Sequence, residues 1–91
     1  MSALSPAAFK ALKQRVHALK PVVLMGNKGL TTAVQEEIAC ALKAHELIKI
    51  RVAADERDAR EAMIAEICNV QHAELIQKVG HMATIYKKRV D

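Results

Sequence analysis

The sequence predicts a small α/β domain in the order α-β-α-β-α-β-β, with a mixed four-stranded sheet packed against helices. Apolar residues recur at helical spacing in three segments, and four shorter segments are rich in the β-branched and apolar residues of strands. Two β-α-β units in sequence imply right-handed crossovers, and the last two strands are close enough to form a hairpin. With 91 residues, the range 1–91 is predicted to be one domain.

The first helix is predicted to begin after Ser5, because serine is a good N-cap and Pro6 suits the first helical position. Pro21 is predicted to end it. Its core-facing stripe consists of Phe9, Leu12, Val16 and Leu19. A basic stripe beside it consists of Lys10, Lys13, His17 and Lys20.

The apolar run at residues 22–25 is typical of a strand that is buried on both faces. Thr32 and Gln35 predict a capping box at the start of a second helix, which continues to about residue 44. Residues 47–52 alternate in polarity and predict a strand with Lys49 and Arg51 on the face opposite the apolar residues. The sequence does not say which of these faces is covered.

Asp58 and Glu61 predict a second capping box, at the start of a third helix. The inward-facing stripe of that helix is predicted to be Ala59, Met63, Ile67 and Val70. Residues 73–79 and 82–86 predict two strands, and Gly80 with His81 predicts the tight turn that joins them.

Charge is distributed unevenly along the chain, although the formal net charge is only +4. Residues 1–29 contain five basic residues and no acidic one, whereas residues 30–86 contain six basic and nine acidic residues. Lys87, Lys88 and Arg89 then restore positive charge near the C-terminus. Two basic ends indicate a polyanionic partner, most simply a nucleic acid, although a solvated surface would carry the same charges.

The sequence Gly26-Asn27-Lys28-Gly29 separates the first predicted strand from the second predicted helix. Glycines let a ligand approach the backbone closely, and the free amides at a helix start suit a phosphate. A GxxG loop also clamps nucleic-acid backbone in KH domains. The alternative is an ordinary strand-to-helix turn. Neither a dinucleotide-binding fingerprint nor a P-loop is present.

Residues suited to catalysis are scattered, so no enzyme, cofactor, metal site or small-molecule substrate is predicted. The histidines show no metal-ligand spacing with Cys40 or Cys68, and both cysteines are interpreted as small buried helix residues. Tyr86 is expected to cap the core or to stack on a base. No apolar run reaches the roughly 18 residues of a membrane span, and a cytoplasmic location is expected.

Residues 19–31, LKPVVLMGNKGLT, closely resemble the CRM domain, the chloroplast RNA-splicing and ribosome-maturation family. Residues 45–52, HELIKIRV, resemble the second signature of that family, and residues 80–87 resemble its closing strand. The resemblance extends over essentially the whole chain, whose length is similar to that of the bacterial YhbY-type members. Lys87 follows the tyrosine where family members commonly have an arginine.

The resemblance implies a fold similar to the C-terminal domain of a bacterial translation initiation factor. It also implies binding to RNA of large ribosomal subunit precursors and a role in ribosome assembly. The predicted RNA-binding set, which combines the loop with the basic residues, is Gly26, Asn27, Lys28, Gly29, Lys10, Lys13, Lys20, Lys87, Lys88 and Arg89. The alternative function is a protein-interaction module that docks on a ribosomal protein or assembly factor, through Glu36 and Glu37 of the second helix.

Overall fold

The computed structural model describes residues 4–26 and 29–88 of the chain. The elements follow one another in the order α1 (Pro6–Arg15), η1 (Val16–Ala18), β1 (Pro21–Met25), α2 (Thr32–His45), β2 (Leu47–Val52), α3 (Arg57–Gln71), β3 (Glu74–Val79) and β4 (Met82–Tyr86). The predicted order α-β-α-β-α-β-β is confirmed, with the short 3-10 helix η1 added after α1. None of the described helices is long and apolar enough to cross a membrane.

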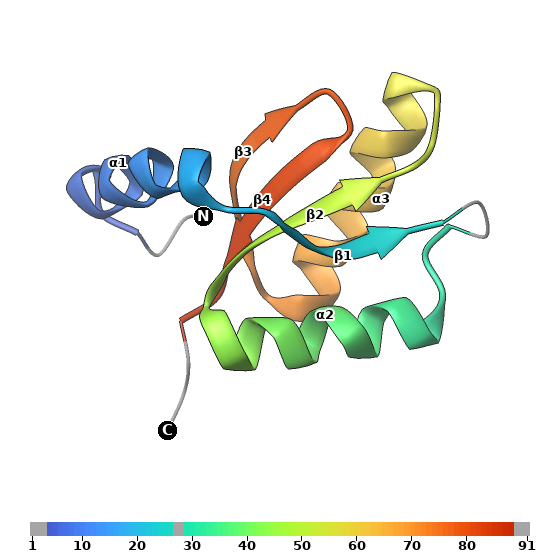
Figure 1. Cartoon of the computed structure of the whole chain (residues 1–91), viewed down its shortest axis with the longest axis horizontal. Helices are drawn as coiled ribbons and strands as arrows, with labels where there is room; N and C mark the ends of the chain where they lie inside the picture. Colours follow the sequence, from blue (N-terminus) through green and yellow to red (C-terminus); the bar gives the residue numbers. More distant parts are fainter. Residues whose placement is uncertain (1–3, 27–28, 89–91) are drawn as a thin grey trace.

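The four strands form one mixed sheet in the order β1-β2-β4-β3. β1 runs parallel to β2, whereas β4 runs antiparallel to both of its neighbours, β2 and β3. Helices α2 and α3 lie along one side of the sheet, and α1 lies apart from them at one end of the molecule (Figure 1). β1 and β3 are therefore the edges of the sheet.

Each side of the sheet has its own apolar cluster. The larger cluster joins α2 and α3 to alternate residues of the central strands, among them Ile48, Ile50 and Ile85, all of which are fully buried. The smaller cluster lies under α1 and includes Leu47 and Ile76 from the sheet. Because successive residues of a strand point to opposite faces, Leu47 and Ile48 place the two clusters on opposite sides of β2.

The prediction that residues 22–25 are buried on both faces is wrong. Val23 and Met25 are buried, but Val22 and Leu24 are 47% and 66% exposed. The reason is the position of β1 at the edge of the sheet, where α2 covers one face and α1 does not extend over the other. An apolar run in the sequence does not distinguish this arrangement from a strand covered on both faces.

Both predicted capping boxes are wrong in detail, although both helices form. The N-cap of α2 is Thr31, whose hydroxyl accepts a hydrogen bond from the Val34 amide at 3.2 Å. With Thr31 as the N-cap, the third helical position is Val34, which has no polar side chain, so no capping box forms; the Gln35 side chain instead accepts a hydrogen bond from Gln71 of α3. The N-cap of α3 is Glu56, without a side-chain cap, since the chain enters this helix two residues before Asp58.

Two further predictions about the helices need correction. α1 ends at Arg15 and continues as η1, so the chain is already extended at Leu19, before it reaches Pro21. In α3 the buried line passes through Ile64, Ile67 and Gln71, and Val70 is 51% exposed. Ile67 is buried as predicted and Met63 packs against the core, but Ile64 and Gln71 take the fully buried positions, and Gln71 brings a polar side chain into the interface with α2.

That polar side chain ties the two large helices together. The Gln71 amide nitrogen donates to the main-chain carbonyl of Gln35 at 2.9 Å and to the Gln35 side-chain oxygen at 2.8 Å. Gln71 is only 7% exposed, so water cannot easily replace these bonds. The link fixes α3 against α2 under the sheet.

We expect Gln71→Ala to lower the free energy of unfolding by about 2 kcal/mol, because it removes both hydrogen bonds to Gln35 and the packing of a side chain that is only 7% exposed. Urea unfolding followed by circular dichroism measures the loss. Asn69→Ala, at an exposed position of the same helix, is the control and should stay within about 0.5 kcal/mol of the parent. Equal losses in the two variants would contradict this role of Gln71.

Candidate nucleic-acid interface

The face of the sheet opposite α2 and α3 is only partly covered by α1, and its open part combines apolar and basic side chains. Register pairs Leu24 with Arg51, Arg51 with Met82, and Met82 with Val79, which forms one row across all four strands. Leu24, Arg51 and Val79 are exposed. We call this surface the open sheet face. The side of residues 47–52 that meets solvent is therefore the side with Lys49 and Arg51.

A second row lies beside the first and closer to α1. Lys49 pairs with Thr84, and Thr84 pairs with Gln77. A bulge between Leu75 and Gln77 lets β3 turn both Ile76 and Gln77 toward the α1 side. Ile76 thereby reaches the cluster under α1, while Gln77 lies at the border between α1 and the open sheet face.

Two adjoining hollows connect α1 with this face. The first, which we call the basic hollow, has a volume of about 370 Å³ and is lined by Lys10, Lys13, Gln14, His17 and Gln77. The second, the sheet hollow, has a volume of about 360 Å³ and is lined by Val16, His17, Lys49, Gln77, Val79, Met82 and Thr84. They share His17 and Gln77 in their linings, so they adjoin one another, and together we call them the depression beside α1. None of these lining residues is acidic.

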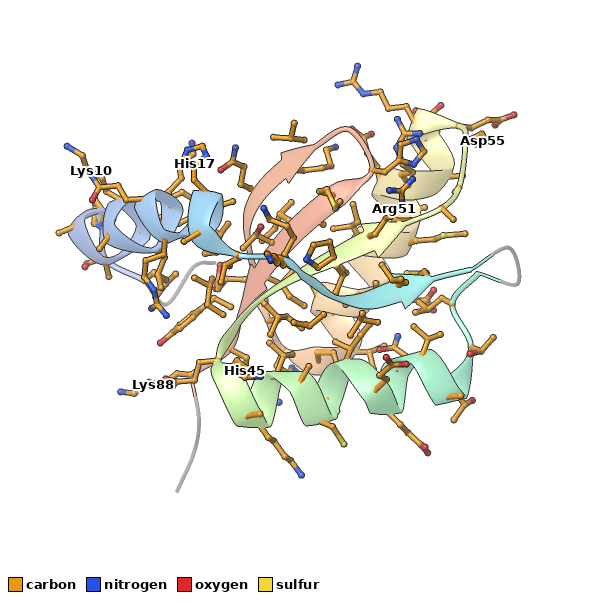
Figure 2. The ribbon with its side chains drawn as sticks, viewed as in Figure 1. Lys10, His17, His45, Arg51, Asp55 and Lys88 are labelled. Atoms are coloured by element: carbon orange, nitrogen blue, oxygen red, sulfur yellow. The ribbon has the colours of Figure 1, made fainter. Side chains whose placement is uncertain are left out.

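The predicted basic stripe is brought together only in part. Lys10, Lys13 and His17 line the basic hollow, as helical spacing predicts. Lys20 is exposed but lies beyond η1, where the extended chain at Leu19 has left the helix. Figure 2 shows Lys10, His17 and Arg51 in the upper half of the view, with His45 and Lys88 in the lower half.

The other predicted basic residues fall elsewhere. The Lys87 amide donates to the Glu46 carbonyl at 2.9 Å, which places this end of the chain beside the end of α2. Lys88 is exposed there. Arg89, Asn27 and Lys28 lie outside the described residues. The predicted set is therefore distributed over at least three places rather than forming one patch.

Gly26 and Gly29, the two ends of the glycine loop, differ in whether they could accommodate a side chain. The Gly29 amide donates to the Gly26 carbonyl at 3.1 Å. Gly29 has a φ of +74°, which disfavours any side chain, whereas a Cβ at Gly26 would meet nothing within 4 Å. The backbone at Gly26 is therefore accessible to a ligand. The first turn of α2, which lies within the described residues, contains no acidic residue that would repel an anion.

Sequence interpretation missed Lys49, Arg51 and Gln77 as candidate interface residues. Alternation placed Lys49 and Arg51 on one face, but only the packing of α2 and α3 shows that theirs is the open one. Gln77 owes its place to the bulge in β3, for which the sequence contains no glycine or other specific signal.

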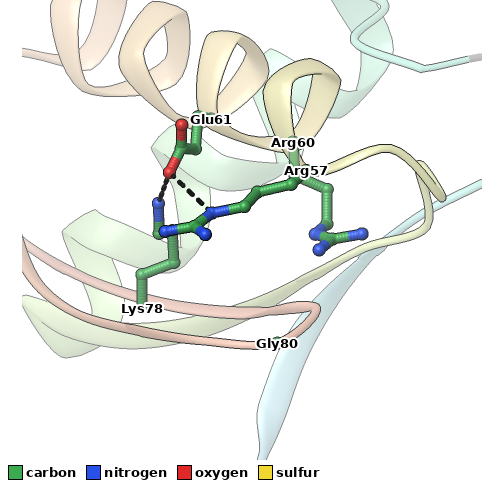
Figure 3. Close-up of a pocket in the computed structure, with 5 residues that line it drawn as sticks. All are labelled: Arg57, Arg60, Glu61, Lys78 and Gly80. Carbon is green, nitrogen blue, oxygen red and sulfur yellow. Dashed lines mark hydrogen bonds and ion pairs between the residues drawn. The ribbon is translucent and has the colours of Figure 1, made fainter.

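A third hollow, at the β3–β4 hairpin, is basic but its cations are already engaged. It has a volume of about 160 Å³ and is lined by Arg57, Arg60, Glu61, Lys78 and Gly80 (Figure 3). Lys78 hydrogen-bonds to Glu61, and the Arg57 guanidinium lies 3.4 Å from the same carboxylate. Arg60 donates to the carbonyls of Ala54 and Asp55. This cluster braces α3 against the hairpin.

The cysteines and histidines do not assemble into a reactive site. Cys40 is exposed, so its predicted burial is wrong: the buried line of α2 passes through Ile38 and Leu42, and Cys40 lies about 200° around the helix from Ile38. Burial, with Glu74 nearby, raises the pKa of Cys68 and disfavours its thiolate. Among the described residues, no group of three histidine, cysteine or acidic side chains could hold a metal ion.

Comparison with known proteins gives consistent matches along the chain. The model of the CRS1 / YhbY (CRM) domain matches residues 4–87. A Pseudomonas aeruginosa protein named as a probable RNA-binding protein is 42% identical over 86 residues, covering 94% of this chain and 83% of that protein. A Haemophilus influenzae protein named as an RNA-binding protein is 39% identical over 87 residues, covering 96% and 88%. A Staphylococcus aureus solution structure has the same fold, with a TM-score of 0.83, 24% identity and coverage of 97% and 92%.

The brace at the hairpin predicts a pH-dependent contribution to stability. The hydrogen bond and charge of Lys78, with Arg57, hold the pKa of Glu61 below its usual 4.5. A lowered folded-state pKa stabilises the fold above the unfolded pKa, and this stabilisation is lost as pH falls through the folded value. Glu61→Gln should therefore lower the melting temperature at pH 7, and the difference should disappear in acid.

Thermal unfolding of both proteins between pH 7 and pH 3 measures this effect. Glu66→Gln, at an exposed position of the same helix, is the matched control and should change little at any pH. A Glu61→Gln difference that persists unchanged at pH 3 would show that the ion pair is not its cause.

Proposed function

Because this chain belongs to the CRS1/YhbY (CRM) domain family, we propose that it is an RNA-binding protein without catalytic activity. The observation that carries the proposal is the depression beside α1, made of two adjoining hollows whose lining, among the described residues, includes three lysines and no acidic residue. The names of its relatives support RNA as the partner.

Phosphate groups are the natural ligands of this depression. Lys10 and Lys13 on α1 and Lys49 on β2 border it, and Arg51 extends the positive charge along the next row of the sheet. Neutralising phosphates with lysine and arginine releases counterions, which favours binding and makes the affinity depend on salt. Arg51 can also contact one phosphate through two parallel hydrogen bonds.

The loop at residues 26–29 is proposed as a second contact. Gly26 leaves its backbone accessible, Lys28 supplies charge, and the N-terminus of α2 favours an anion. The C-terminal end of β1, which leads into this loop, and α1 lie toward opposite ends of the molecule, whose longest Cα extent is 35 Å (Figure 1). An RNA that touches both must therefore be a folded or extended segment rather than a single nucleotide. Lys20, Lys87, Lys88 and Arg89 would add attraction from outside this path.

The biological target is proposed to be ribosomal RNA in precursors of the large subunit, with the protein assisting assembly in the cytoplasm. Support for this finer proposal comes from the resemblance to the bacterial single-domain members of the family. A small domain that holds RNA mainly by its phosphates suits such a role, because it can bind structured RNA without reading a long sequence.

Single substitutions test the interface. Lys10→Ala, Lys28→Ala and Arg51→Ala should each weaken RNA binding and reduce the slope of log Kobs against log salt by about 0.7–0.9, the value of one lost phosphate contact. Fluorescence anisotropy over a salt series measures both quantities. Lys43→Ala is the control, since Lys43 is exposed on α2, behind the other face of the sheet. An unchanged slope would remove that residue from the interface.

Sedimentation of a native lysate tests the ribosomal target. The protein should migrate with large-subunit precursors at low salt and be released as salt rises, because phosphate contacts are screened. Digestion with ribonuclease before sedimentation is the control, and it should also release the protein. A complex that survives digestion would favour the alternative of docking on a protein, and migration at the top of the gradient at low salt would oppose the ribosomal assignment.

A further inference from the structure

We propose that the sheet hollow accepts one unpaired nucleobase, so that the protein prefers RNA with a loop or bulge over fully paired RNA. The inference rests on the proposed RNA-binding function and adds to it the kind of RNA that is bound. The inference comes from the side chains that line the hollow. They include apolar and neutral polar groups as well as the cations that would bind phosphates.

The size and shape of the hollow suit a flat ligand group. Its volume of about 360 Å³ falls in the lower part of the roughly 300–1,000 Å³ found for small-molecule sites. The sheet forms its base through β3, β4 and β2, and η1 contributes Val16 and His17. A base turned out of a stack can therefore lie on the sheet with its edge toward η1.

The apolar part of the hollow favours a base over a phosphate. Val79 is 61% exposed and pairs across the hairpin with Met82, which also lines the hollow. Aliphatic side chains offer nothing to an anion but pack against the face of an aromatic ring, and methionine sulfur makes favourable contacts with such rings. Leu24, 66% exposed, lies at the far end of the same row, beyond Arg51.

Polar groups in the second row can contact the edge of a base. The Gln77 side chain offers both a donor and an acceptor, and Lys49 offers a donor, whereas Thr84 in the same lining is only 1% exposed. Unpaired bases expose their Watson–Crick edges to such groups, whereas paired bases do not. The hollow therefore distinguishes unpaired from paired RNA by chemistry as well as by shape.

Positive charge on both sides of the hollow favours a nucleotide over an apolar protein segment. The basic hollow adjoins it through His17 and Gln77 and presents Lys10 and Lys13. On the other side, Arg51 lies next to Met82 in the register of β2 and β4. Phosphates before and after the inserted base would meet these cations, as expected for a strand that crosses the open sheet face.

The test compares two RNAs with equal numbers of phosphates, a hairpin with an unpaired loop and a blunt duplex, by fluorescence anisotropy at one salt concentration. The parent protein should bind the hairpin more tightly. Val79→Ala should weaken hairpin binding about fivefold, because it removes part of the apolar contact, and should leave duplex binding unchanged. Since Val79 is largely exposed, folding should tolerate the change, and circular dichroism checks this.

Val70→Ala is the matched control, because Val70 is a similarly exposed valine on α3, away from the hollow. Gln77→Met supplies a second probe that keeps side-chain size but removes the amide, and it should weaken hairpin binding more than duplex binding. Equal affinity of the parent for both RNAs, or a hairpin preference that survives both substitutions, would overturn the proposed base site while RNA binding stands. Failure to bind either RNA would overturn the proposed function as well.

Discussion

The alternation of side chains along β2 is the constraint on which the structure depends. Ile48, Ile50 and Val52 are fully buried under α2 and α3, and this fixes the direction in which Lys49 and Arg51 point. A shift of one residue in register would bury both cations and expose the core. The free energy that holds the fold together therefore also positions the charges proposed to bind RNA.

The two faces of the sheet differ because the helices cover one face more fully than the other. α2 and α3 cover one face, and Gln71 and Gln35 join them by hydrogen bonds in a nearly dry interface. α1 covers only part of the other face, which leaves the depression beside it open. The ion pairs of Glu61 with Lys78 and Arg57 join α3 to the hairpin on the covered side of the sheet, away from the depression.

Much of the fold was predictable because each element has a local signal. Ser5 does cap α1 by accepting a hydrogen bond from the Ala8 amide, residues 47–52 do form a strand, and Gly80 with a φ of +57° does form the hairpin turn. The errors occurred where tertiary packing decides. Thr31 rather than Thr32 caps α2, and Gln35 bonds to α3 instead of completing a capping box; β1 is half exposed because it lies at an edge of the sheet.

The sequence by itself determined the order of the elements, the basic stripe of Lys10 and Lys13, and the family, since spacing and motifs are properties of the chain alone. Only the tertiary structure decided that Lys49 and Arg51 face solvent, that Gln77 joins them, and that Lys87 lies at the end of α2. Alternation divides a strand into two faces, but it does not say which one a helix will cover. That choice is made by contacts between residues far apart in the chain.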